Sequence, residues 1–279
     1  MSSSWAPWFR GNRRQAFRVA GLVWFVPIGM LVAGALLLAS RSDAPQRLSL
    51  EQVWASPTVM RPLGSGEGGI DLAAFVGHAC IRVLLLSAAV AAIACLVGVP
   101  LGAFAAMQRG RLEIVVIRCC DLLQGFPTFL LALAVLSAVE APARWHLGIV
   151  FLLTAWAPFA RMAQAQSRSV ANAEFVLAAR ALGASRRHIV IKHFLPHLVG
   201  PVTVQLGSCA AGVVLSESAL GFVGLGPSDG VSLGALLEQG TVAMLLDARV
   251  LVIASLAIVA TSGALQIASE GLRQRMLRG

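Results

Sequence analysis

Long apolar runs alternate with short polar segments along most of the chain. Six of these runs approach the length of about 20 residues that an α-helix needs to cross a bilayer. They fall at 19–40, 81–107, 114–139, 147–166, 198–225 and 249–269. The fourth run is short, so its flanks must supply the rest of the helix, and it carries Pro158, which we expect to kink it. The pattern predicts an all-α fold, a polytopic transmembrane bundle of about six spans.

Composition supports a membrane protein and fixes its orientation. Of the 279 residues, 57% are hydrophobic and 13% are charged, which is too apolar for an ordinary soluble domain. The net charge of +9 arises mainly from arginines that flank the runs on one side. Because basic residues accumulate on the cytoplasmic side, we expect both termini and the connection 167–197 to be cytoplasmic. The basic charge therefore requires no nucleic-acid partner.

The same pattern divides the chain into parts. We expect a cytoplasmic tail at 1–18, a first span at 19–40, an extracytoplasmic segment at 41–77 and a core at 78–279 with five spans. The basic tail before the first run resembles a signal peptide. The run exceeds the about 7 to 15 apolar residues of a cleavable segment, so we interpret it as a retained span.

Cysteine and histidine patterns suggest no metal site. The five cysteines lie in or beside apolar stretches without a CxxC motif, which is typical of small core residues. They are Cys80, Cys95, Cys119, Cys120 and Cys209. His188, His193 and His197 share the basic connection without a carboxylate or cysteine nearby, so we interpret them as interface or solvent-exposed residues.

Four ionisable residues lie within the predicted spans: Arg82, Arg118, Asp121 and Glu217. Each costs about 2.5 to 3.5 kcal/mol at the centre of a membrane helix and therefore needs a partner or water. Arg118 and Asp121 are three residues apart, which favours an ion pair between them over a role in a substrate path. Glu217 has no cation nearby in sequence, so its partner lies on another helix or subunit, or it lines a pathway.

The segment 170–196 contains a helix, a glycine turn and a second helix. Asn172 is the expected N-cap of the first helix, and Glu174 complements its dipole. Gly183 fits a left-handed C-cap. Ser185 would cap the second helix, which Pro196 would end or kink before the fifth span. Physical chemistry leaves two interpretations open: an amphipathic segment resting on anionic lipid, or a helix inserted into a groove of a cytoplasmic partner.

The stretches LAARALGAS and HFLPHL resemble the EAA loop of permease subunits in binding-protein-dependent ABC importers. Leu177 stands where that family usually has a glutamate. The resemblance implies that the loop couples the spans to ATPase subunits. The residues implied in this coupling are Ala178, Ala179, Gly183, Ala184, Ser185, Leu195 and Pro196.

Other stretches, in the same order along the chain, resemble the second permease subunit of the dipeptide, oligopeptide and nickel group. These stretches are RPLGSGEGGIDL (61–72), RCCDLLQGFPTFLLAL (118–133), LSESALGFVGLG (215–226) and EGLRQRM (270–276). The resemblance implies a type I importer-like fold with a cytoplasmic coupling helix, in a bacterial inner membrane. It also implies peptides, a related small solute or a metal chelate as the transported solute.

The partners implied by this resemblance are a second permease subunit, two cytoplasmic ATP-binding subunits and an extracytoplasmic solute-binding protein. The segments 41–77 and 226–240 would face the solute-binding protein, and the pattern predicts a helix from Ser232 to Glu238. The stretch GSGEGG lacks the lysine and hydroxyl residue of a phosphate-binding loop. ATP and Mg²⁺ are therefore expected on the partner subunits, and this chain is expected to be no enzyme and to hold no cofactor.

Two hypotheses compete with the importer. One is a proton-coupled secondary transporter that uses Glu217 or Asp121. The other is a membrane scaffold that has the permease fold and does not transport. Dependence of uptake on a separate ATPase would separate the importer from the first alternative, and an intact loop that binds no ATPase would indicate the second.

Overall fold

The computed structural model describes residues 26–40, 48–108, 110–183, 192 and 194–276, and it confirms the predicted all-α class. Its α-helices are α2 (Val26–Ala39), α3 (Leu72–Gln108), α4 (Arg111–Gly125), α5 (Thr128–Leu136), α6 (Arg144–Ala171), α7 (Glu174–Ala181), α9 (Leu195–Phe222), α10 (Leu233–Val242) and α11 (Arg249–Met276). Two short 3-10 turns, η1 (Leu50–Gln52) and η2 (Glu67–Gly69), lie between α2 and α3.

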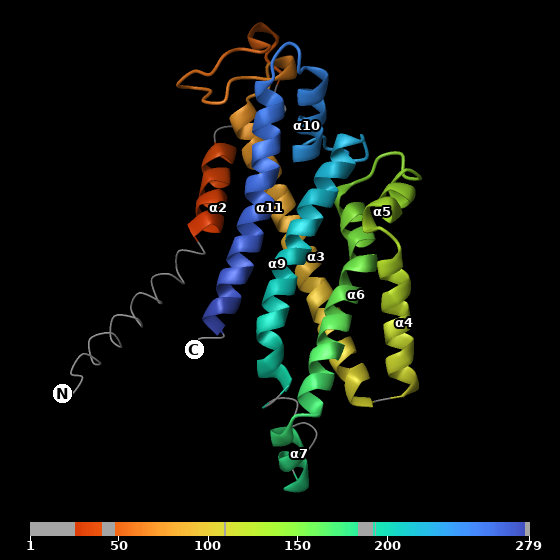
Figure 1. Ribbon diagram of the computed structural model, residues 1–279. Coiled ribbons are helices and arrows are strands. Elements are labelled where there is room, and N and C mark those ends of the chain that lie inside the picture. The colour runs from red at the N-terminus through yellow and green to blue at the C-terminus, as the bar shows by residue number, and fades with distance from the viewer. Residues whose placement is uncertain (1–25, 41–47, 109, 184–191, 193, 277–279) are drawn as a thin grey trace, which may run out of the picture.

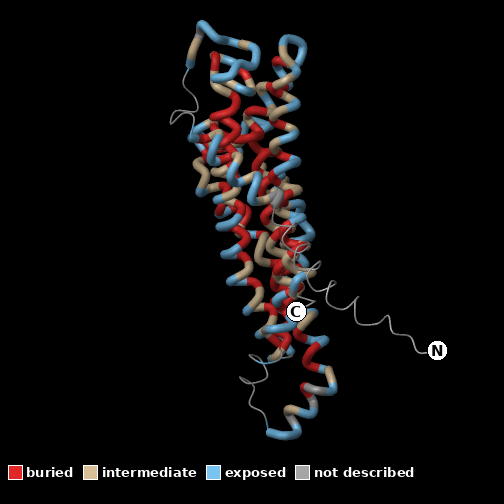
Figure 2. Tube along the Cα trace, turned by 90° about the vertical axis from the view of Figure 1, so that its left-hand side faces the viewer, coloured by how far each residue is buried: buried red, intermediate tan, exposed pale blue. Residues whose placement is uncertain are grey.

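Four long helices, α3, α6, α9 and α11, run side by side along the length of the molecule (Figure 1). The short α7 lies at one end, and α10 lies at the opposite end together with the connection 48–71. Buried positions recur along the helices between exposed ones (Figure 2). Many exposed side chains on the long helices are large and apolar, such as Leu96 and Leu256, as expected for helices that contact lipid.

Among the described residues, α3, α6, α9 and α11 are long and apolar enough to cross a bilayer. The bent pair α4 and α5 adds a fifth crossing if it is counted as one span. The helix α2 has 14 residues, and the rest of the span predicted at 19–40 lies outside the described residues. Six spans and cytoplasmic termini therefore remain predictions.

The third predicted span is not one continuous helix, contrary to the prediction for 114–139. α4 ends at Gly125, α5 begins at Thr128, and the two are bent by 74°. Pro127 has no N–H to donate, and a residue before proline avoids helical dihedrals. Phe126 accordingly is extended, with φ −97° and ψ 128°. The break leaves the chain either as a bent span or as a re-entrant segment.

The closest helix contact joins α3 to α6 through two glycines. Gly98 and Gly102 are four residues apart and face the backbone of Trp156 and Ala160. A Cβ atom at Gly102 would lie 1.9 Å from the carbonyl oxygen of Ala160, and one at Gly98 would lie 2.4 Å from that of Trp156. Small residues at this spacing let two membrane helices approach closely. α6 continues through Pro158 from Arg144 to Ala171, so the short fourth run is extended on both sides as expected.

α10 packs tightly against α9. A Cβ atom at Gly234 would lie 2.0 Å from the Ser218 carbonyl oxygen. Ser232 caps the helix, because its hydroxyl accepts a hydrogen bond of 3.0 Å from the Ala235 N–H. The predicted helix at Ser232–Glu238 is thus present, and it extends to Val242.

The connection 48–71 is ordered by hydrogen bonds to two polar side chains. The Ser65 hydroxyl donates to the Gln52 carbonyl oxygen and accepts from the Ala55 N–H. Asp71 caps α3, since its carboxylate accepts a hydrogen bond of 2.9 Å from the Ala73 N–H. α3 consequently begins at Leu72, earlier than the predicted run 81–107.

Candidate functional site

The helix α7 projects from the end of the bundle and is anchored through one buried residue. Val176 is fully buried and belongs to a cluster with Val170 and Ala171 at the end of α6. Phe194, just before α9, and Met107, near the end of α3, complete this cluster. A displacement of α7 would therefore act directly on the ends of three long helices.

Gly183 has φ +82°, which confirms the predicted left-handed conformation after α7. A Cβ atom at this position would meet no atom within 4 Å, so there is room for a side chain. Glycine is favoured here because of the left-handed backbone conformation. Ala178 is exposed and Ala179 is half-buried, while Leu182 is 89% exposed beside the glycine turn. The projecting end of α7 thus presents small and apolar surface. Ala184 and Ser185 lie outside the described residues, as do His188 and His193.

One prediction around this segment is wrong. Asn172 is the C-cap of α6 and not the N-cap of the next helix, which begins at Glu174. Pro196 occupies the first turn of α9, where a missing N–H costs no helical hydrogen bond. Leu195 and Pro196 therefore begin the long helix, and the second helix predicted from Ser185 lies outside the described residues.

Two ion pairs join the antiparallel helices α4 and α6 toward the same end of the bundle. The inner pair is formed by Glu113, which is 4% exposed, and Arg168, whose Nη2 donates to Glu113 Oε2 at 2.9 Å. Gln164 Nε2 donates to the other carboxylate oxygen at 2.5 Å. Both oxygens of this buried carboxylate therefore have a donor from α6.

The second pair corrects the prediction for Asp121. Its partner is Arg161 on α6, not Arg118 on its own helix. Glu113 and Asp121 are about two helical turns apart on α4, and Arg168 and Arg161 are about two turns apart on α6. Because the two helices are antiparallel, the two arginines follow in the opposite order along the chain. Acidic residues on α4 thus meet arginines on α6 in register, whereas Arg118 is exposed on another part of the α4 surface.

We expect Glu113→Ala to destabilise the folded protein by about 2 kcal/mol, because it removes charge-assisted hydrogen bonds from a buried group. Asp121→Ala should cost less than about 1 kcal/mol, since its pair is exposed. Unfolding of the purified variants in detergent by denaturant measures both values. Equal losses of unfolding free energy in the two variants would contradict the proposed difference in burial between the two ion pairs.

At the opposite end, four charged side chains form a connected group. Asp229, in the connection between α9 and α10, accepts hydrogen bonds from Arg82 of α3 at 2.6 Å and from Arg144 of α6 at 3.0 Å. Arg144 Nη1 also lies 3.7 Å from Oε1 of Glu217, which is fully buried on α9. Within the described part of the chain, neither oxygen of Glu217 has a hydrogen bond. Among the described residues, Arg144 is thus the cation that lies nearest to the buried carboxylate of Glu217.

Backbone hydrogen bonds fix the same connection. Arg144 Nη2 donates to the Val231 carbonyl oxygen at 3.0 Å, and the Ser228 N–H donates to the Pro142 carbonyl oxygen at 2.8 Å. These bonds tie the connection between α9 and α10 to the start of α6.

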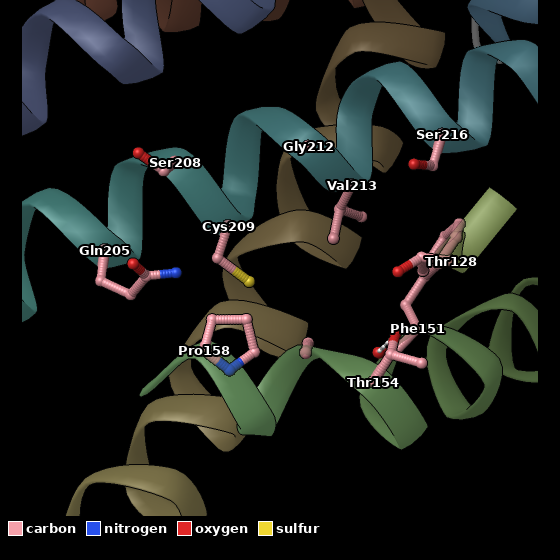
Figure 3. A pocket seen from close by; sticks show the side chains of 11 residues that line it. Thr128, Phe151, Thr154, Pro158, Gln205, Ser208, Cys209, Gly212, Val213 and Ser216 are labelled. Atoms are coloured by element: carbon pink, nitrogen blue, oxygen red, sulfur yellow. Dashed lines mark hydrogen bonds between the residues drawn. The ribbon is translucent and has the colours of Figure 1, made fainter. Parts of the chain in front are cut away.

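A cavity of about 250 Å³ lies between α5, α6 and α9. Figure 3 shows the Gln205 amide and the Cys209 thiol of α9 directed toward Pro158 of α6, with Thr128 and Ser216 at the other end of the space. None of the lining residues is charged. The cavity was not foreseen from the sequence, because its lining depends on the rotation of three helices.

Among the described residues, no group of three or more histidine, cysteine or acidic side chains could hold a metal ion. All five cysteines are free thiols; Cys80 and Cys120 are buried, but Cys119 is exposed, contrary to the expectation of a core position.

The charged partners that sequence reasoning missed are Arg144, Asp229, Glu113 and Arg161. Arg144 and Asp229 lie in short polar connections far from Glu217 in sequence, so spacing alone could not join them. Glu113 had a usable signal, because Glu113 and Asp121 match the spacing of two arginines on α6.

Residues 98–276 match the family described as binding-protein-dependent transport system inner membrane component. Among curated proteins, the chain is 29% identical over 265 residues to a putative peptide transport system permease protein of Brucella suis, covering 94% of this chain and 87% of the relative. It is 30% identical over 194 residues to the oligopeptide transport system permease protein OppC of Haemophilus influenzae, covering 69% and 62%. It is 26% identical over 218 residues to the dipeptide transport system permease protein DppC of Bacillus subtilis, covering 78% and 67%.

Proposed function

The chain belongs to the family of binding-protein-dependent transport system inner membrane components, and from this premise we propose that it is one transmembrane subunit of a peptide importer driven by ATPase subunits. Membership makes the chain a multi-pass inner-membrane transport subunit and not an enzyme. Proteins of this family work with ATPase and substrate-binding partners. Peptides are the proposed solute, because the similar proteins of Brucella suis, Haemophilus influenzae and Bacillus subtilis are named as peptide, oligopeptide and dipeptide permeases.

The observation that carries the coupling part of this proposal is the form of α7. It projects from the bundle, ends in a left-handed glycine, and is anchored through Val176 to the ends of α3, α6 and α9. A short helix of this kind fits a groove of a cytoplasmic partner. Two ATP-binding subunits would dock below the loop 170–196, and a second permease subunit would supply the other half of the path. The connection 48–71 and the segment 226–240 would face the solute-binding protein.

Gly183→Val tests the coupling role. A β-branched residue in the left-handed region costs about 1 to 3 kcal/mol, so the turn should change its conformation. We expect ATP-driven peptide uptake in proteoliposomes to fall by about tenfold or more, which corresponds to about 1.4 kcal/mol, while membrane insertion is retained. Gly183→Asn is the matched control, because asparagine tolerates this conformation, and it should keep most of the uptake. Equal uptake by the two variants would contradict the coupling role of the turn.

Crosslinking from Ala179→Cys tests the docking itself. The thiol should form a crosslink with an ATPase subunit whose yield changes on ATP binding. Leu245→Cys, at the opposite end of the molecule, should form none. Absence of a crosslink from Ala179→Cys in the folded complex would favour the lipid-surface interpretation of α7. Uptake that is driven by a proton gradient without ATPase subunits would favour the secondary transporter.

A further inference from the structure

The cavity between α5, α6 and α9 contains polar side chains that no protein group satisfies. Among the residues that the structure describes, the side chains of Thr128, Gln205 and Ser216 make no hydrogen bond to protein. All three line the cavity at positions within helices of the membrane bundle. Unpaired hydroxyl and amide groups are costly in hydrocarbon, so lipid chains are unsuitable occupants. The cavity therefore suits water or a polar solute.

The wall formed by α6 adds a backbone acceptor. Pro158 has no N–H, so the carbonyl oxygen of Thr154 has no helical donor. Both residues line the cavity, and the Thr154 hydroxyl donates to the Phe151 carbonyl oxygen at 3.3 Å. The Thr154 carbonyl oxygen is thus a backbone acceptor without its helical donor, in a residue that lines the cavity.

We propose that this cavity is a solute-binding subsite of the translocation path, and that it binds the uncharged backbone amide groups of a peptide. This assignment rests on the proposed importer function. Hydroxyl and primary amide groups both donate and accept hydrogen bonds, and therefore match peptide N–H and C=O groups in either orientation. Since no lining residue is charged, the subsite does not select peptides by the charge of their side chains.

The size of the cavity indicates how much of a solute it holds. Ligand sites usually occupy about 300 to 1,000 Å³, whereas this cavity has about 250 Å³. It therefore binds one part of a peptide, and the rest of the peptide would contact other parts of the path.

Cys209 provides a native reporter, because its thiol lies on the cavity wall. The complete transporter is reconstituted with the other four cysteines replaced by alanine, and ATP-driven uptake of trialanine is measured first. Cys209 is then treated with a charged thiosulfonate reagent that does not enter lipid. We expect the thiol to react, and saturating trialanine to slow the reaction several-fold. Leu245→Cys, 95% exposed in the connection between α10 and α11 and outside the cavity, is the control that should react without being protected.

The possible outcomes test the subsite and the importer function separately. Intact ATP-driven uptake of trialanine with an unreactive or unprotected Cys209 would overturn the subsite and leave the importer function standing. Absence of ATP-driven peptide uptake by the unaltered transporter would overturn the importer function, and the subsite with it.

A charge placed on the cavity wall gives a second test, in which the uptake of two peptides is compared within the same variant. Ser216→Asp should lower uptake of diglutamate relative to dilysine several-fold, because a carboxylate at the subsite repels acidic peptides. Ser216→Asn, of similar size and neutral, should leave that ratio unchanged. An unchanged ratio in Ser216→Asp, with uptake still measurable, would overturn the assignment. Loss of uptake of both peptides in Ser216→Asp but not in Ser216→Asn would support a path through this position.

Discussion

Replacing Gly102 by valine is expected to destabilise the bundle by about 3 kcal/mol or more, at the upper limit of overpacking effects. The added Cβ atom would lie 1.9 Å from the carbonyl oxygen of Ala160 and 2.8 Å from its Cα atom. These are backbone atoms of α6, so no flexible side chain can move aside. α3 and α6 would have to separate, and the contact at Gly98 would be lost with them. Denaturant unfolding of the purified protein in detergent measures the loss.

Gly263→Val is the matched control for this change. Gly263 lies within the membrane helix α11, and a Cβ atom there would meet nothing within 4 Å. A substitution without a clash should change the free energy of unfolding by less than about 0.5 kcal/mol. If the two variants lost equal stability, close contact between α3 and α6 would not be the cause.

Arg144→Met is expected to cost about 3 to 5 kcal/mol, the usual effect of removing one partner from a buried charge pair. Glu217 would lose its nearest cation while remaining fully buried, and the hydrogen bonds to Asp229 and Val231 would disappear. Both unfolding in detergent and peptide uptake should report the loss, because the connection between α9 and α10 would be released.

Two companion variants locate the origin of that cost. Arg144→Met combined with Glu217→Gln should recover part of the lost stability, since no buried charge then remains unpaired. Arg82→Met removes only the partly exposed pair with Asp229 and should cost within about 1 kcal/mol. A double variant no more stable than Arg144→Met alone would show that the pairing with Glu217 contributes little.

Local chemistry made much of the fold predictable. The length of the apolar runs identified the long helices, and Gly183 indicated a left-handed turn because few other residues favour that conformation. The bend between α4 and α5 also had a local cause in Pro127, but the apolar run that continues on both sides of it concealed the break. A hydropathy pattern reports solvation and not backbone continuity.

Long-range pairing was not predictable in the same way. Asp121 was assigned to Arg118 because the two share a helix, whereas the structure pairs it with Arg161 on α6. Glu217 and Arg144 approach only once α6 and α9 are packed. The cavity depends on the rotation of three helices about their axes, and no sequence spacing encodes those angles.

The position of the Gly98 and Gly102 contact along α3 makes that helix an unequal lever. At 1.5 Å per residue, the arm from Pro100 to Leu72 is about 42 Å long, and the arm to Gln108 is about 12 Å long. For a rigid rotation about this fulcrum, a displacement of 1 Å near α7 becomes about 3.5 Å at the opposite face. Spin-label distances at the two ends of α3 would measure this gain in displacement, by which a small movement at the α7 end of the molecule would become a wider one at the opposite end.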